Sequence, residues 1–289
     1  MIYYLPTIRS TDEGFENIGD LAGKTRALFI DKLELDFSRC GFFDANMASP
    51  LAVVLARVAD NLNSIEIVNV LPEIERILQK NRFLVNYGYN ALEDTNLTTI
   101  PFRRIQLSEK GRFEDYLQKY LKGKGIPTMT EGLGYRFKQS IFEIYQNAVS
   151  HSESSLGVFV CGQFYPKLQR LDLTIADAGI GIRSTVRKYL KNRVSSVFAI
   201  KWALMERNTT KTGAQPGGVG LKFLKDFISL NEGRLQITSR QGYYEFNDGQ
   251  DNFIKINSDF PGTAVNLEIN TSDTKSYDLD SKISPMDIF

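Results

Sequence analysis

A carboxylate, an amide and an imidazole recur at four-residue spacing on one predicted helix, residues 137–151. Glu143, Asn147 and His151 share a stripe because residues four apart lie on the same face of a helix. Such a stripe can orient a water molecule, bind Mg²⁺ through an amide oxygen and contact an anion, since Mg²⁺ prefers oxygen ligands and keeps several waters. The alternative is a solvated helix face, with His151 packing at the helix end.

Two glycine-containing segments follow at predicted element boundaries. Residues 177–182 (DAGIGI) come after a predicted strand, so a carboxylate lies at the strand end while the glycines let the backbone approach a ligand. Residues 217–221 (GGVGL) open a predicted helix, 221–230, whose N-terminal N–H groups favour phosphate. No Gly-Lys-Ser/Thr follows, so this is not a P-loop. The alternative for residues 177–182 is a strand-to-helix turn that needs a positive φ.

The three segments, in this order, resemble the conserved boxes of the Bergerat-type ATPases, which include gyrase, the ninety-kilodalton heat-shock chaperone, sensor histidine kinases and mismatch-repair ATPases. The resemblance covers about residues 130–270. Residues 143–147 resemble the N box, 177–181 the first glycine box and 218–221 the second. The resemblance implies an α/β sandwich that binds ATP and Mg²⁺. Ala178 departs from the pattern, because many members have Asn there.

The resemblance implies a role for each matching position. Glu143 would be the catalytic base that orients the attacking water, Asn147 would bind Mg²⁺, and Asp177 would accept a hydrogen bond from the adenine amino group. Thr210 falls in the segment that matches the family's mobile lid, and Thr263 on the strand behind the adenine; the alternative for both is ordinary loop and strand chemistry. The full set of ATP-binding residues that the resemblance implies is Asn147, His151, Asp177, Gly179, Gly181, Ile182, Thr210, Gly218, Val219, Gly220, Leu221 and Thr263.

The first hundred residues predict an α/β layer of their own. Predicted strands over 1–8, 33–37 and 65–70 alternate with predicted helices over 49–62 and 73–79, which favours a mainly parallel sheet.

The stretch 43–49 in this layer bears a fainter resemblance to the sulfate-transporter and anti-sigma-antagonist (STAS) domain, which implies a protein-interaction role. Ala45 stands where that family has its phosphoacceptor serine, so the usual phosphorylation switch is not expected. Ser49 is interpreted as a helix cap ahead of Pro50.

With 289 residues, the chain is long enough for two domains. We therefore expect an α/β chain with a STAS-like interaction domain over 1–100 and an ATP-binding domain over 130–271. A connector over 101–129 is expected to hold one strand and one helix, 113–121. The polar tail, 272–289, is expected to be poorly ordered.

Composition excludes several classes of protein. A content of 42% hydrophobic and 24% charged residues excludes a disordered chain and a collagen-like repeat. The net charge of +1 is not that of a polybasic nucleic-acid binder. Residues 1–100 nevertheless hold 9 basic and 14 acidic side chains, whereas residues 101–289 hold 26 basic and 20 acidic ones. The positive charge of residues 101–289 suits an anionic ligand.

Cysteine usage and hydropathy predict a cytoplasmic protein. Cys40 and Cys161 lack metal-ligand spacing and are expected to be reduced thiols. The start of the chain does not resemble a secretory signal, and the longest apolar run, 51–56, is far shorter than the ~20 residues that cross a bilayer.

These observations predict a regulatory protein that binds Mg-ATP and hydrolyses it slowly to change its contacts with a protein partner through the N-terminal domain. One alternative is a protein serine kinase of the anti-sigma type, and another is a non-hydrolysing nucleotide-sensing scaffold. A histidine autokinase is disfavoured, because the single histidine, His151, lies in the nucleotide-binding segment. Direct contact with nucleic acid or membrane is not expected, and ATP-driven homodimers are common in the resembling families.

Overall fold

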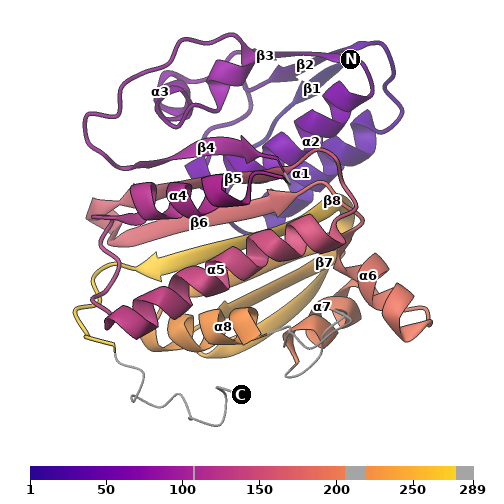
Figure 1. The fold of residues 1–289 in the computed structure, drawn as a ribbon. Helices are drawn as coiled ribbons and strands as arrows, with labels where there is room; N and C mark the ends of the chain where they lie inside the picture. The colour runs from indigo at the N-terminus through magenta and orange to yellow at the C-terminus, as the bar shows by residue number, and fades with distance from the viewer. Residues whose placement is uncertain (107, 206–218, 278–289) are drawn as a thin grey trace.

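The computed structural model describes residues 1–106, 108–205 and 219–277 (Figure 1). The described chain is mixed α/β, with a three-stranded parallel sheet, a five-stranded antiparallel sheet and eight α-helices. This confirms the predicted α/β class.

The smaller sheet is built from the N-terminal strands. Its order is β1 (Ile2–Tyr4), β2 (Lys32–Asp36) and β3 (Ser64–Val68), and both pairs are parallel, as predicted. The helices of this part are α1 (Asp12–Thr25), α2 (Ala48–Asp60) and α3 (Pro72–Lys80), with short 3₁₀ turns η1 (Ala45–Met47) and η2 (Leu84–Tyr87).

Helix α1 is an element that the sequence analysis does not predict. Thr11 caps it by accepting from the Gly14 N–H, and Phe15, Ile18 and Leu21 are buried along one face. Gly14 and Gly19 weaken the helical signal of the sequence. Both are needed for close packing, since a Cβ on Gly14 would lie 1.9 Å from the Arg9 carbonyl oxygen.

The larger sheet has the order β4-β5-β6-β8-β7, and every neighbouring pair is antiparallel. Its strands are β4 (Thr99–Ile105), β5 (Val158–Tyr165), β6 (Arg170–Asp177), β7 (Arg234–Asn247) and β8 (Gln250–Asn270). The helices of this part are α4 (Lys110–Leu121), α5 (Glu131–His151), α6 (Gly181–Leu190), α7 (Ser196–Leu204) and α8 (Val219–Asn231). Helices α4, α5 and α8 cover one face of the sheet, and α1 and α2 lie behind the other (Figure 1).

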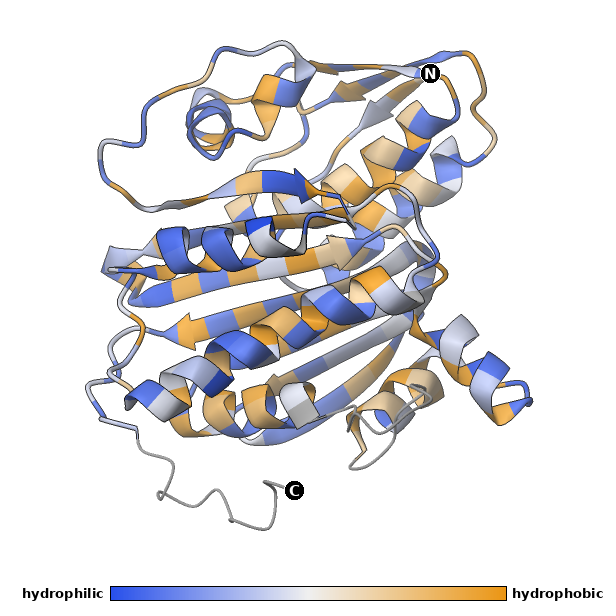
Figure 2. Cartoon of the chain, viewed as in Figure 1, coloured by the Kyte–Doolittle hydropathy of each residue, from blue (hydrophilic) through white to orange (hydrophobic). Residues whose placement is uncertain are grey.

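Strand β6 is buried on both of its faces. Leu171, Leu173 and Ile175 pack in the core under α5 and α8, whereas Ala176 packs in the core on the side of α1 and α2. Apolar and polar residues alternate along the strands and around α5 (Figure 2). This pattern is expected for a sheet whose two faces meet different layers.

The N-terminal helices and the larger sheet share one hydrophobic core. The ring of Phe15 on α1 lies 6.1 Å from that of Tyr243 and 6.3 Å from that of Phe260, between ring centroids. A buried polar contact joins the same layers, because the Asn46 side-chain amide donates to Thr174 Oγ1 at 2.9 Å and to Asn266 Oδ1 at 3.1 Å. The chain therefore stacks four layers, two sheets and two sets of helices.

Residues 43–49, which bear the fainter resemblance to the STAS domain, lie at this contact between the N-terminal layer and the larger sheet. Ala45 is 1% exposed, and its carbonyl accepts from the Asn81 amide. The prediction that Ser49 caps α2 is wrong: Met47 is the N-cap, and Ser49 lies within the helix with its hydroxyl buried and without a hydrogen bond.

Four further expectations concern the connector, the tail, the cysteines and a membrane-spanning helix. The segment expected to connect the domains supplies β4 and α4. The expectation of a poorly ordered tail is wrong for residues 272–277, because Tyr277 is buried and its carbonyl accepts from the Thr130 N–H at 3.0 Å; residues 278–289 lie outside the described chain. Cys40 and Cys161 are both free and buried. No helix in the described ranges has the length and apolar character to span a membrane.

Candidate functional site

Helix α5 presents the first group of predicted site residues. Ile141, Ile144 and Ala148 are buried against the sheet, which fixes the rotation of the helix. Glu143 and Asn147 lie beside this buried stripe and are half-buried. Helix α5 ends at His151, whose side chain lies outside the described structure.

Glu143 joins α5 to the first turn of α8. The Gly220 N–H donates to Glu143 Oε2 at 2.9 Å, and a Cβ on Gly220 would lie 2.4 Å from the same oxygen. A carboxylate is favourable here because the N-terminus of a helix carries partial positive charge. The structure thus brings the predicted base next to the predicted second glycine box.

Asp177 ends β6 with its carboxylate buried in the protein. The Gly179 N–H donates to Asp177 Oδ1 at 2.8 Å. Burial raises the pKa of Asp177 to about 7, while the backbone N–H groups of Gly179 and Thr263 act in the opposite direction by stabilising the charged form. The result is a buried acceptor whose charge changes near neutral pH.

The first glycine box packs against the end of α5. The Ile180 N–H donates to the carbonyl oxygen of Ser152, the C-cap of α5, at 2.8 Å. A Cβ on Gly179 would lie 2.2 Å from that oxygen, so only glycine fits there. Gly181 has a φ of +78°, which favours glycine. These contacts within the protein explain both glycines; their contact with a nucleotide stays a prediction.

Two hydroxyl groups connect this loop to β7 and β8. The Ile182 N–H donates to Ser239 Oγ at 2.9 Å, and the Ser239 hydroxyl donates to the Gly262 carbonyl at 2.9 Å. Thr263, which pairs with Asp177 across the sheet, has its Oγ1 3.1 Å from Ser239 Oγ. Sequence reasoning missed Ser239, whose place beside the loop depends on pairing between distant strands.

The N-terminal layer touches the same loop. Arg57 on α2 donates from Nη1 to the carbonyl oxygen of Ala178 at 3.0 Å. Burial, followed by the nearby charges of Arg240 and Arg26, lowers the pKa of Arg57. Sequence analysis could not find this contact, since the residues are 121 positions apart.

Several predicted residues are placed only in part. Thr210 and Gly218 lie outside the described residues, and of Val219 only its place at the start of α8 is described. Leu221, on the first turn of α8, is half-buried and packs against the core under α5 and α8.

The acidic and imidazole side chains of the described chain do not gather into a metal-binding cluster. Among the described residues, no cluster of three or more His, Cys, Asp or Glu side chains has the geometry of a metal site. The Asn147 side chain forms no hydrogen bond with the described parts of the chain, so its amide oxygen is available to a ligand. An oxygen donor of this kind fits Mg²⁺ when the phosphates of a nucleotide supply further oxygens.

No protein-family model and no curated protein matches this chain.

Proposed function

We propose that the chain is a regulatory protein that binds Mg-ATP at the site formed by α5, the Asp177 loop and the start of α8. One observation carries the proposal: residues from three separate segments meet, through the Gly220–Glu143 and Ile180–Ser152 hydrogen bonds of 2.9 and 2.8 Å. The hydrogen bonds and glycine contacts bring the three segments together around α5, which is the arrangement that the proposed nucleotide site requires.

Each residue would act by ordinary hydrogen bonding and electrostatics. The buried carboxylate of Asp177 suits the adenine amino group, which is a donor. The Asn147 amide oxygen would hold Mg²⁺, which neutralises phosphate charge when bound. The N-terminus of α8 would face the phosphates. Glu143 would orient a water molecule as general base once its bond to the Gly220 N–H is released.

Arg57 supports a regulatory role for the N-terminal layer. Its hydrogen bond to the Ala178 carbonyl lies one residue from Asp177, so a nucleotide that displaces this loop also displaces the end of α2. We propose that this contact transmits nucleotide binding to a partner protein on the STAS-like layer.

The Glu143–Gly220 bond favours a second candidate, a nucleotide-sensing scaffold without turnover. In this structure the carboxylate serves as a helix cap rather than as a free base. A kinase acting on its own antagonist-like position receives no support, because Ala45 has no hydroxyl and Ser49 is 0% exposed.

Incubation with ATP labelled on the γ-phosphate separates these candidates, with Asp177→Ala as the matched control. Labelled free phosphate, released slowly by the wild type and not by the control, is expected for the ATPase. Label on the protein would favour the kinase. ATP binding without either product would favour the scaffold.

A further inference from the structure

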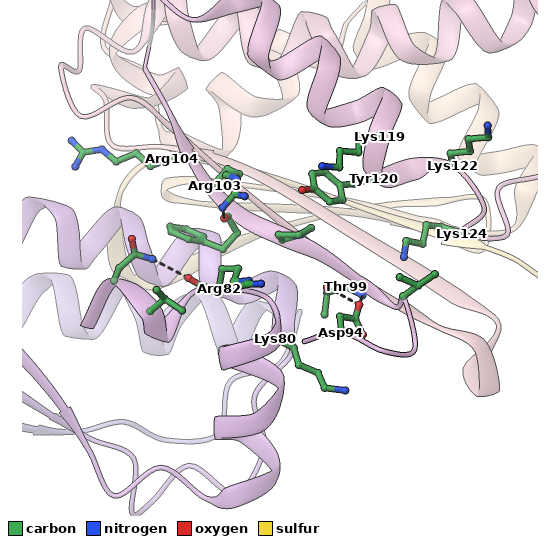
Figure 3. Close-up of a pocket in the computed structure, with 15 residues that line it drawn as sticks. Lys80, Arg82, Asp94, Thr99, Arg103, Arg104, Lys119, Tyr120, Lys122 and Lys124 are labelled. Carbon is green, nitrogen blue, oxygen red and sulfur yellow. Dashed lines mark hydrogen bonds between the residues drawn. The ribbon is translucent and has the colours of Figure 1, made fainter. Parts of the chain in front are cut away.

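A cleft lined by basic side chains runs along the edge of the larger sheet. It has a volume of about 830 Å³ and lies over β4, between α4 on one side and the end of α3 with η2 on the other (Figure 3). Its seven cationic residues are Lys80, Arg82, Arg103, Arg104, Lys119, Lys122 and Lys124. No residue of the proposed nucleotide site lines it.

The lining of this basic cleft is strongly positive, with seven cationic residues and one acidic residue. Among the described residues, none of the seven cations forms an ion pair with a carboxylate. Asp94 is the acidic residue in the lining, and its Oδ2 accepts from the Thr99 N–H and hydroxyl at 2.6 and 2.8 Å. Clefts with charge of one sign raise the local concentration of oppositely charged ligands.

Lys124 is the least exposed of the seven cationic residues. The residue is only 7% exposed, and its ammonium group forms no ion pair with a carboxylate of the described chain. Burial lowers the pKa of Lys124, and Asp94 only partly opposes that effect. A partly desolvated cation without an ion-pair partner is stabilised by an anion that binds beside it.

The cations are spread along the cleft rather than gathered at one point. Arg103 and Arg104 lie towards one end of β4 and Lys124 beside the other (Figure 3). A strand of this length spans roughly 23 Å at about 3.3 Å per residue. This distance suits a chain of phosphates better than one phosphate group or a mononucleotide.

Apolar surface accompanies the charge. Val85 and Leu97 are 40% and 74% exposed, and the ring of Tyr120 is half-buried beside Lys119. Cations interleaved with an aromatic side chain such as Tyr120 are typical of grooves for single-stranded nucleic acid, where phosphates meet cations and bases stack on aromatic rings. We infer that the basic cleft binds single-stranded nucleic acid through its phosphate backbone.

The overall charge of +1 does not conflict with this inference, because the cleft concentrates cations that acidic residues elsewhere balance in the total. The first hundred residues carry more acidic than basic side chains, yet they contribute Lys80 and Arg82 to the cleft.

Fluorescence anisotropy with labelled 20-residue oligothymidine and oligouridine tests the inference. The test variant is Lys119→Gln/Lys122→Gln, and the matched control is Lys167→Gln/Lys255→Gln, at exposed lysines outside the cleft. Each phosphate contact contributes about −0.7 to the slope of log K against log salt, so removing two contacts should make the slope less negative by about 1.4. Binding should weaken roughly 25-fold at 0.1 M salt. The control and Asp177→Ala should bind as the wild type does, so the result stands apart from the ATP proposal.

Three results would overturn the inference. The first is that the wild type does not bind either oligonucleotide at low salt. The second is that the control variant loses as much affinity as the test variant. The third is that inorganic polyphosphate or polyaspartate of equal charge competes as well as an unlabelled oligonucleotide, which would show that the cleft recognises negative charge and not nucleic acid. Circular dichroism and urea midpoints equal to those of the wild type confirm that the variants fold.

Discussion

Replacing Asp177 by Asn should change how stability depends on pH, by an amount that follows from its burial. Its pKa is about 7 in the folded protein against 3.8 for the ordinary group. Because the pKa of Asp177 is higher in the folded protein than in the unfolded chain, its protonated carboxyl group contributes to the free energy of unfolding. This contribution is fully present below the unfolded pKa and is lost as pH rises through the folded pKa. As the pH rises from 5 to 8, titration of this one group should lower the free energy of unfolding by about 2.6 kcal/mol.

Urea unfolding of the wild type and Asp177→Asn at pH 5 and pH 8 measures this contribution. Other groups titrate in both proteins, so the informative quantity is the difference between the two pH-dependent changes in unfolding free energy. We expect the wild type to lose about 2.6 kcal/mol more than Asp177→Asn on going from pH 5 to pH 8. Equal changes in the two proteins would refute the assignment of Asp177 as a buried carboxyl group.

Three other predictions follow from named contacts. Glu143→Gln keeps an oxygen that can accept from the Gly220 N–H, so it should slow phosphate release ~10²–10⁴-fold with unchanged ATP affinity. Glu143→Ala also loses this hydrogen bond and should lower the unfolding free energy by about 1 kcal/mol. Phosphate release by Glu143→Gln at the wild-type rate would exclude Glu143 as the base. Asn46→Ala loses the hydrogen bonds that join the layers and should cost about 1–3 kcal/mol in urea unfolding, so an unchanged midpoint would contradict the shared core. Mass spectrometry after incubation with Mg-ATP should find no phosphate on Ser49, which is fully buried; stoichiometric phosphate there would contradict this packing.

The strongly periodic segments of the fold could be predicted from sequence. Helix α5 carries apolar residues at regular helical spacing, and the parallel order of β1, β2 and β3 follows from strands separated by helices. Helix α1 was missed because Gly14 and Gly19 weaken its propensity, and only the finished fold shows what those glycines pack against.

The contacts between segments could not be predicted. Glu143 caps α8 through Gly220, 77 residues away, and Arg57 reaches Ala178 from the other layer. Local patterns identify which residues can do chemistry, but tertiary packing decides which of them meet. The basic cleft illustrates the same limit, since its charges come from three separate stretches of chain and vanish in a sum over the whole sequence.

Calorimetric titration with ATP, with and without Mg²⁺, tests the central claim most directly, using the wild type, Asp177→Ala and Asn147→Ala. We predict one nucleotide bound per chain. Asp177→Ala should bind about tenfold or more weakly, because losing one partner of a buried hydrogen bond costs ~1–3 kcal/mol, and Asn147→Ala should lose the Mg²⁺-dependent part of the affinity. The absence of wild-type binding at millimolar ATP, or equal affinity in the wild type and Asp177→Ala, would contradict the account.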